Sequence, residues 1–335
     1  MKALKIAGII LLSLAVLVLL LGLIVPKSYR VERTAVVNAP AKLVFRHVQY
    51  WKNWQAWLPW AGMDSTMKVS LEGLDGTKGS MFKWTGAKTG EGIITNAGVK
   101  PGETLYYQML FIKPWKSEAD GFVGVVPSDS GTAVTWGFTG RSPYPWNVLT
   151  LFMDMDKALG GDFEKGLGLL KSLCEEEMAR VLQYQVRTVP FPGRTYAAIR
   201  KTLTMDQVSG FFAESIPALM QALGRNGLSP AGAPCGIFYT FDETTGSSDM
   251  AAAVPANITK AIGGIVPIRL PAAKAHVIDY VGTFEGSALA YDAFDLYFAE
   301  KRLKPGTPVI EEYLTDTGKE KDPAKQRVRI FFFAE

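Results

Sequence analysis

The sequence has few of the residues that build disulfide and metal sites. Among its 335 residues there are two cysteines and two histidines. Cys174 and Cys235 lie far apart, in segments that we assign to different domains, which excludes a disulfide framework and a cysteine-rich zinc site. Neither His47 nor His276 has a cysteine or a second histidine at ligand spacing. We therefore expect no structural metal.

Short catalytic motifs are missing as well. The sequence has no Gly-x-Ser-x-Gly nucleophile elbow, and neither histidine lies near a serine or cysteine with an orienting acid. Gly73, Gly76 and Gly79 lack the Lys-Ser/Thr pair of a phosphate-binding loop. We therefore expect no cofactor, and nucleophilic catalysis finds little support.

The chain has no strongly basic segment outside its N-terminus. Its formal net charge is +4, and residues 1–27 contain three lysines and no acidic residue. Residues 28–185 have 17 basic and 16 acidic side chains, and residues 186–335 have 16 of each. A surface that binds nucleic acid needs a clear basic surplus, so we expect no nucleic-acid partner.

One long apolar run spans residues 6–25, where Ser13 is the only polar side chain. As a helix at about 1.5 Å per residue, this run matches a hydrocarbon core of roughly 30 Å. It is too long for a typical signal peptide, and no small-x-small cleavage site follows it. We interpret residues 1–27 as a retained single-pass anchor rather than a cleaved signal. A short basic tail usually stays in the cytoplasm, so we expect the rest of the chain to be extracytoplasmic.

Tryptophan is confined to the first half of the chain, where all eight residues lie between Trp51 and Trp146. Such a shift indicates two domains, with the boundary after the last tryptophan. We assign residues 28–182 to the first domain and residues 183–335 to the second.

The first domain has the pattern of an α+β fold. Tyr29–Val37 alternates as a strand, and Pro40 begins a helix. Residues 66–140 contain short β-like runs divided by glycines, which is typical of an antiparallel meander. A long helix over residues 149–182 completes a helix-grip arrangement, in which a curved sheet and a helix enclose an apolar cavity. The apolar stripe of this helix consists of Phe163, Leu167, Leu170, Cys174 and Met178.

Two motifs of this domain are similar to those of a known superfamily. Tyr29–Pro40 and Val44-Phe45 precede tryptophans at every third position from Trp51 to Trp60, and the closing helix contains Asp162–Lys171. Together they resemble the SRPBCC superfamily of START-like, polyketide-cyclase-like ligand-binding domains. The resemblance implies the helix-grip fold; it does not identify a ligand, because members bind or transform very different apolar molecules.

The tryptophans from Trp51 to Trp60 lie close to one helical face. Core packing around the helix-to-sheet turn explains this spacing best. The alternative is an apolar lid over the SRPBCC-like cavity, with Trp57 and Trp60 as candidates for ligand contact, or a belt at the bilayer interface.

The second domain repeats itself. Leu228–Pro230 with Phe238–Asp242 parallels Leu303–Pro305 with Glu312–Asp316, at offsets of 75 to 74 residues. Each half has the pattern strand, helix, strand, strand, and duplicated halves usually pack about a pseudo-twofold axis with a cleft between them.

The two helices of this repeat have recognisable ends. The first begins at a capping box, Thr204–Gln207, and ends at Gly227. The second runs from about Gly286 to Lys301. We expect its apolar stripe to consist of Leu289, Ala293, Leu296 and Tyr297.

The strand Pro308–Asp316 is the most specific element of the second domain. It is similar to the Glu-x-Tyr-x-x-Asp strand of the GyrI-like effector-binding domain, which also ends multidrug-sensing AraC- and MerR-type regulators. The resemblance implies a duplicated β-α-β-β domain whose pocket glutamate, two residues before the tyrosine, attracts lipophilic cations. Here that residue is Glu311. An SRPBCC-like domain and an anchor replace the regulators' helix-turn-helix, so a transcriptional role is not expected.

Glu311 is therefore the main candidate for ligand binding. In a strand, Glu311 and Tyr313 share one face, and the resemblance favours this face as the pocket side. Tyr313 and Tyr239, at equivalent repeat positions, are the expected aromatic walls, and Ile237 is the expected counterpart of Glu311. Weaker candidates, which the core also explains, are Tyr280, Phe284 and Tyr291. The alternative is a solvated pair of acids, Glu311 and Glu312, on an edge strand.

These features predict a membrane-tethered protein that binds hydrophobic or cationic amphipathic small molecules. The resemblance also includes stand-alone hydrolases, so the alternative is a hydrolase or cyclase that acts on an apolar molecule with Glu311 as general base. A binding role is favoured over an enzymatic one. A third alternative is a scaffold whose pockets are filled by side chains, and no sequence marker sets the oligomeric state.

Overall fold

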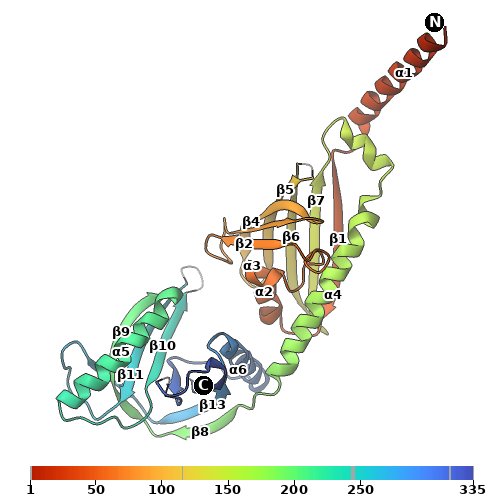
Figure 1. Ribbon diagram of the computed structural model, residues 1–335. Coiled ribbons are helices and arrows are strands. Elements are labelled where there is room, and N and C mark those ends of the chain that lie inside the picture. The colour runs from red at the N-terminus through yellow and green to blue at the C-terminus, as the bar shows by residue number, and fades with distance from the viewer. Residues whose placement is uncertain (1, 115, 243–245, 317, 335) are drawn as a thin grey trace. The chain divides into compact units, whose positions relative to one another are not determined.

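The computed structural model describes residues 2–114, 116–242, 246–316 and 318–334, in two compact units, Met1–Met178 and Ala179–Glu335 (Figure 1). Both units combine helices with a curled antiparallel sheet. The α+β class predicted from the sequence is confirmed.

The first unit begins with α1 (Lys2–Ile24), which is long and apolar enough to cross a membrane. Only 6% of the span Lys5–Ile24 is buried. The end of α1 is held by the side-chain amide of Asn147, which donates hydrogen bonds to the carbonyl oxygens of Gly22, at 2.8 Å, and Val25, at 2.7 Å.

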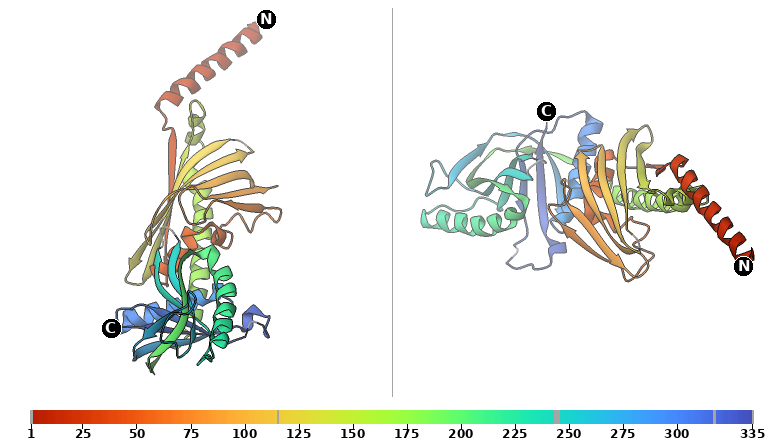
Figure 2. Two further views of the ribbon diagram at one scale, coloured as in Figure 1. Left: turned by 90° about the vertical axis from the view of Figure 1, so that its left-hand side faces the viewer. Right: turned by 90° about the horizontal axis from the view of Figure 1, so that it is seen from above.

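The sheet of the first unit is a seven-stranded antiparallel meander that curves strongly (Figure 2). Its strand order is β1-β7-β6-β5-β4-β3-β2. The first and last strands of this unit, β1 and β7, are therefore neighbours. The strands are β1 (Ser28–Val37), β2 (Lys68–Glu72), β3 (Met81–Gly86), β4 (Gly90–Lys100), β5 (Thr104–Lys113), β6 (Ser117–Ser128) and β7 (Gly131–Arg141).

The helices of this unit are α2 (Ala41–Gln49), α3 (Trp51–Trp54), the 3₁₀ helix η1 (Trp146–Leu151) and α4 (Met155–Val181). The expected start of the long helix at residue 149 is wrong. The carboxylate of Asp154 accepts a hydrogen bond from the backbone N–H of Lys157 at 3.1 Å, which caps the first turn and lets α4 begin at Met155.

The core of the first unit lies between α4 and the sheet. Phe163 of α4 stacks on Trp136 of β7 with ring centroids 4.4 Å apart. Trp51, Trp54 and Trp57 are fully buried and pack edge-on or tilted against one another. Core packing is therefore the confirmed explanation for these three tryptophans.

The second unit has an eight-stranded sheet of order β12-β9-β11-β10-β14-β15-β13-β8. Its strands are β8 (Arg187–Phe191), β9 (Arg194–Thr204), β10 (Cys235–Asp242), β11 (Ser247–Pro255), β12 (Val266–Leu270), β13 (Ala273–Val281), β14 (Val309–Tyr313) and β15 (Arg327–Phe333). The order is symmetric about the pair β10–β14, which is what a duplicated unit requires.

The two halves of this sheet exchange their first strands. The β8 strand, which precedes β9 in the chain, pairs with β13, and β12, which precedes β13, pairs with β9. Each half therefore has one strand more than the expected strand, helix, strand, strand pattern. The exchange ties the halves together by backbone hydrogen bonds.

Two helices and two 3₁₀ turns complete the second unit: α5 (Met205–Arg225), η2 (Glu285–Ser287), α6 (Ala288–Lys301) and η3 (Pro323–Lys325). The predicted capping box of α5 is confirmed, with the Thr204 backbone N–H donating to the Gln207 side chain at 3.3 Å. Gly227 follows with a φ of 66°, a left-handed conformation that favours glycine.

The buried face of α6 differs from the expected stripe. Of the four stripe residues, Ala293 alone is buried. Phe294 and Phe298 face the sheet instead, where both pack on Phe332 of β15 at centroid distances of 4.7 and 5.5 Å. These two rings bury more apolar area than Leu289 and Leu296 would, so they set the rotation of the helix.

Candidate functional site

Glu311 lies in the middle of β14, between β10 and β15. Ile310 is buried in an apolar cluster on one face of the sheet. Alternation then places Glu311 and Tyr313 on the opposite face, where α5 packs: the ring of Tyr313 contacts Phe212 of α5 at 5.7 Å. The predicted sharing of one face by Glu311 and Tyr313 is what the strand shows.

The Glu311 carboxylate accepts two hydrogen bonds from tyrosines. Tyr291 of α6 donates its hydroxyl to Oε1 at 2.5 Å, and Tyr313 donates to Oε2 at 3.5 Å. The side chain is buried, with Glu311 only 5% exposed. Within the described part of the chain, no lysine or arginine forms an ion pair with it.

Burial dominates the electrostatics of this carboxyl group. It raises the pKa of Glu311 above its ordinary value, while the hydrogen bonds from Tyr291 and Tyr313 lower the pKa in part. Burial also raises the pKa of Tyr291 well above its ordinary value, so the tyrosine keeps its proton and remains a donor. The site therefore combines a carboxyl group of raised pKa with two neutral hydroxyl donors.

Aromatic rings surround this group from both helices and from the sheet. On the α5 side, Phe212 contacts Tyr313 and also Phe238 of β10, at 6.2 Å. On the α6 side, Tyr291 contacts Phe332 of β15 at 5.7 Å. Such an arrangement of ring faces around a carboxylate suits an organic cation, through charge pairing and cation–π contact.

Gly236 makes room for these rings. It pairs with Glu311 across β10 and β14. A Cβ atom at this position would lie 2.7 Å from both the Tyr313 hydroxyl and the Phe238 ring. A glycine at this point is therefore required by the close approach of the two aromatic side chains.

The register of β10 against β14 corrects the expected repeat equivalence. Ile237 pairs with Ile310 and Phe238 with Val309, and paired residues of antiparallel strands point to the same face. If equivalent residues of the two halves were 74 positions apart, they would point to opposite faces of the sheet. Residues 75 positions apart point to the same face. The counterparts of Glu311 and Tyr313 are thus Gly236 and Phe238.

Tyr239, an expected wall of the site, lies on the other face of the sheet. Its ring packs against the cluster that contains Ile237 and Ile310. The guanidinium of Arg200 stacks over it at 3.8 Å. The structure thus brings Tyr313 and Tyr291 to Glu311, and Phe238 occupies the position that the sequence predicts for Tyr239.

Tyr280 and Phe284 lie around the turn after β13. Tyr280 is buried and donates its hydroxyl to the carbonyl oxygen of Thr283 at 2.6 Å, which stabilises this turn. Phe284 is 60% exposed. Their positions fit a structural role for Tyr280 and a surface position for Phe284.

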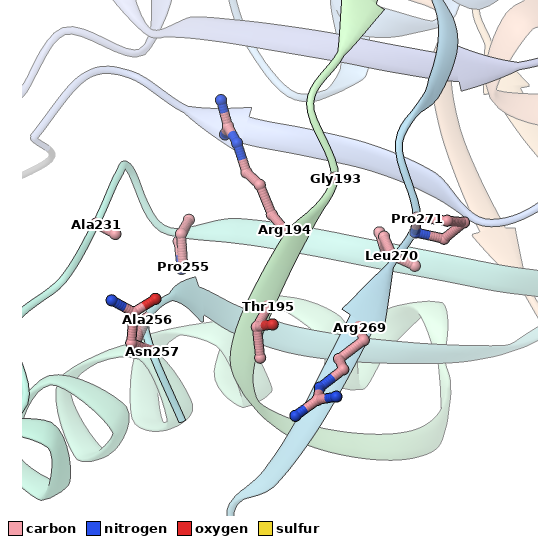
Figure 3. Close-up of a pocket in the computed structure, with 10 residues that line it drawn as sticks. All are labelled: Gly193, Arg194, Thr195, Ala231, Pro255, Ala256, Asn257, Arg269, Leu270 and Pro271. Atoms are coloured by element: carbon pink, nitrogen blue, oxygen red, sulfur yellow. The ribbon is translucent and has the colours of Figure 1, made fainter. Parts of the chain in front are cut away.

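A cavity of 620 Å³ lies elsewhere in the second unit, between the ends of β9, β11 and β12 (Figure 3). Its two arginines, Arg194 and Arg269, extend in opposite directions (Figure 3). Arg194 is already paired, because it donates to the buried carboxylate of Glu312 at 2.5 Å. Glu311 does not line this cavity, and we do not assign it to the site.

The first unit has an apolar cavity of 510 Å³. Its lining comes from β3, β4, β5, the β3–β4 turn and the segment that follows α3: Leu58, Trp60, Met63, Met67, Phe82, Trp84, Lys88, Thr89, Ile94, Met109 and Phe111. Of the two tryptophan candidates, Trp60 lines the cavity and donates its indole N–H to Asp162 at 2.9 Å. Trp57 is in the core and donates to the His47 carbonyl oxygen.

Asp64 fastens the segment that covers one side of this cavity. Its carboxylate accepts hydrogen bonds from Thr66 and from the backbone N–H groups of Lys88 and Thr89. These bonds hold the pKa of Asp64 well below its ordinary value, and the bond from the Thr66 hydroxyl has the largest effect. The charged carboxylate thus ties the segment between α3 and β2 to the β3–β4 hairpin.

Sequence reasoning missed several residues of the Glu311 site. Phe212, Phe238 and Phe332 come from three different elements, and the sequence places each on an apolar stripe or strand typical of core. Gly236 carried one usable signal, because an isolated glycine inside a strand often marks a close approach of another group.

The family comparisons match both units. The family described as polyketide cyclase / dehydrase and lipid transport matches residues 28–175, and the GyrI-like small molecule binding domain matches residues 184–332. One family model thus matches each unit, in agreement with the resemblances that the sequence motifs indicate. Both descriptions concern small molecules or lipids, which supports a ligand-binding role. A comparison with curated proteins finds no match.

Solved structures resemble single units of this chain. The C-terminal domain of EcmrR has 17% identity and a TM-score of 0.41, over 45% of this chain and 98% of that one. SAV2435 bound to tetraphenylphosphonium has 14% identity and a TM-score of 0.35, over 45% and 93%. Norcoclaurine synthase from Thalictrum has 12% identity and a TM-score of 0.37, over 45% and 96%. At these scores the resemblances identify neither ligand nor activity.

Proposed function

We propose that this protein is a membrane-tethered binding protein that takes a lipophilic organic cation at Glu311. The observation that carries the proposal is the buried carboxyl of Glu311, whose described partners are tyrosine hydroxyls and not a basic side chain. Burying a carboxylate without a cation is costly, and this burial raises the pKa of Glu311. A bound organic cation supplies the positive charge that the carboxylate of Glu311 otherwise lacks as a partner.

The aromatic surroundings support a cation that is large and apolar. Tyr291, Tyr313 and Phe212 offer ring faces and edges around the carboxyl group. A small hydrated metal ion would gain little from these rings, whereas an organic cation gains cation–π contact and apolar burial. Because Glu311 is only 5% exposed, such a ligand must move aromatic side chains aside as it enters.

The test is a titration of the full chain in detergent with tetraphenylphosphonium, followed by native mass spectrometry. We expect Glu311→Gln to weaken binding by an order of magnitude or more, since it removes the carboxylate that pairs with the cation. Glu300→Gln is the matched control, because Glu300 is an exposed acid on α6. Equal weakening in both variants, or none in Glu311→Gln, contradicts the proposal.

One observation also favours the enzymatic alternative, in which Glu311 acts as a general base on an apolar small molecule. A carboxyl group with a raised pKa beside two proton-holding tyrosines has the character of a general acid or base. The same mass-spectrometric assay, with a panel of apolar esters in place of tetraphenylphosphonium, separates the two functions. A binding protein returns its ligand unchanged, whereas an enzyme yields a mass-shifted product that Glu311→Gln does not form.

For the first unit we propose a hydrophobic ligand in the 510 Å³ cavity. Its lining is apolar and aromatic, apart from Lys88 and Thr89, and its volume lies within the range of small-molecule sites. A lipophilic molecule would bury its surface against Trp60, Ile94 and Phe111. Displacement of a neutral dye such as Nile red tests this site separately from Glu311.

The membrane tether is the remaining part of the proposal. The apolar span Lys5–Ile24 is almost uncovered by protein, and the basic residues before it favour a cytoplasmic N-terminus. Both units would then lie on the extracytoplasmic side, near the lipid in which amphipathic cations concentrate. Carbonate extraction of membranes tests the tether, and protease access to the second unit in intact cells tests the orientation.

A further inference from the structure

The segment from Tyr144 to Met153, which contains η1, exposes an unusual run of apolar side chains. Trp146 is 66% exposed and Phe152 is 81% exposed. Leu149, Leu151 and Met153 are each more than half exposed. Soluble surfaces rarely gather so many large apolar side chains over ten residues, and such patches mark interaction sites.

This segment is fixed beside the last turn of α1 (Figures 1 and 2). The buried side chain of Asn147 donates both amide hydrogens to carbonyl oxygens of α1 and its end, at Gly22 and Val25. Tyr144 packs on the same turn, so closely that a Cβ atom at Gly22 would lie 2.9 Å from its ring. The position of the segment along α1 is therefore set by specific contacts.

We propose that residues 144–153 form a second membrane contact, which lies in the headgroup region of the bilayer beside the exit of α1. This inference rests on the proposed tether. The apolar run of α1 ends at Val25, so the carbonyl groups held by Asn147 lie at the level where the hydrocarbon core ends. Side chains fixed at that level face lipid.

The chemistry of the segment fits a lipid surface. Tyr144 and Trp146 are the residue types enriched at membrane interfaces, and Leu149 and Phe152 can insert into the acyl boundary. The charges near the segment balance. Asp154 and Asp156 follow it and are offset by Lys157 and by Lys27 at the exit of α1. The contact is therefore apolar in origin and does not require anionic lipid.

A second membrane contact restricts how the first unit tilts on the bilayer. With one transmembrane helix followed directly by a strand, the domain would be free to tilt. Because β1 starts at Ser28, three residues after Val25, the end of the sheet where Ser28 pairs with Arg141 of β7 is held close to the lipid surface.

The test uses the full chain in phosphatidylcholine nanodiscs with an environment-sensitive fluorophore on a single introduced cysteine. Native Cys174 and Cys235 are fully buried and are not labelled. Phe152→Cys places the label in the segment. Val126→Cys is the matched control, since Val126 is also exposed but lies by the β6–β7 turn, at the opposite end of β7 from Ser28 and roughly 30 Å away.

We expect nitroxide-labelled lipid to quench the label at position 152 several-fold more than the label at position 126, and a water-soluble quencher to do the reverse. A label at position 152 that behaves like that at position 126 overturns the inference. Leu14→Cys, in the middle of α1, separates the two proposals. If lipid quenches position 14 but not position 152, the tether stands and the second contact fails; if it quenches neither, both fail.

Two further results bear on other occupants of the segment. Protection of position 152 from the aqueous quencher without quenching by lipid means that another protein surface, such as a second copy of the chain, covers the segment. That result also overturns the inference. Quenching by lipid that persists in dilute nanodiscs with one copy each supports it.

Discussion

The hydroxyl of Tyr291 donates a hydrogen bond to the Glu311 carboxylate at 2.5 Å, from α6 to β14. This bond joins a helix and a strand of the same half through a buried group whose other hydrogen bond, from Tyr313, is long. It also stabilises the charged form of Glu311, whereas burial favours the protonated form. The ease with which this carboxyl ionises therefore depends on Tyr291.

Tyr291→Phe is expected to shift the pH dependence of cation binding. Without this donor the pKa of Glu311 rises further, so binding of tetraphenylphosphonium begins at a higher pH. A hydrogen bond to a charged group contributes about 1.5–3 kcal/mol, so the midpoint should move by about one pH unit or more. The measurement is the dissociation constant as a function of pH.

Tyr313→Phe is the matched control for this prediction. It removes the same hydroxyl group, but the Tyr313 oxygen lies 3.5 Å from the carboxylate, where a hydrogen bond contributes little. We expect a clearly smaller shift. Equal shifts in the two variants would show that the distances do not determine the pKa of Glu311.

Stability should depend on Glu311 in a defined pH range. Its pKa is raised in the folded protein, so the folded state retains the proton above the ordinary value of 4.5, where the unfolded chain releases it. The contribution of Glu311 to stability is full below pH 4.5 and is lost as the pH rises through the folded-state pKa. Over that range, stability falls by up to about 1.4 kcal/mol per pH unit.

Glu311→Gln removes this dependence because glutamine does not titrate. We therefore expect the melting temperature of the variant, relative to the natural protein, to increase as the pH rises above 4.5. Thermal unfolding of both proteins at a series of pH values measures the difference. A difference that stays constant or shrinks with rising pH means that the folded-state pKa is not raised.

Gly236→Ala should destabilise the second unit. The added Cβ meets the Tyr313 hydroxyl and the Phe238 ring at 2.7 Å, so the aromatic side chains must shift, at about 1–3 kcal/mol. Gly210→Ala provides the control, because nothing lies within 4 Å of its Cβ in the exposed face of α5. There the change is expected to stabilise the helix by about 0.5–1 kcal/mol. Denaturant unfolding that gives both variants the same sign contradicts this account.

The fold and the shared face of Glu311 and Tyr313 were within reach of the sequence. The capping box at Thr204, the buried stripe from Phe163 to Cys174 and the common face of Glu311 and Tyr313 all follow from local periodicity. Such features depend on residues that are neighbours in the chain. Their prediction needs no knowledge of long-range pairing.

The parts that could not be predicted depend on register and on distant contacts. Successive residues of a strand point to opposite faces of the sheet. A repeat offset that is wrong by one residue therefore places Tyr239 on the Glu311 face, where the structure has Phe238. The exchange of β8 and β12 depends on pairing between strands that are far apart in the chain, as in Thr188 with His276, which are 88 residues apart. The hydrogen bond from Tyr291 likewise depends on how α6 rotates on the sheet.

The last prediction concerns the cavity of the first unit. Ile94 is buried on β4 and lines the 510 Å³ space, so Ile94→Trp should fill part of it and weaken the binding of Nile red. Leu71→Trp is the control, since Leu71 is exposed on β2 and is not among the lining residues. Because Glu311 lies in the other unit, neither variant should change the affinity for tetraphenylphosphonium. Nile red bound equally well by Ile94→Trp and the natural protein would mean that the dye binds outside this cavity.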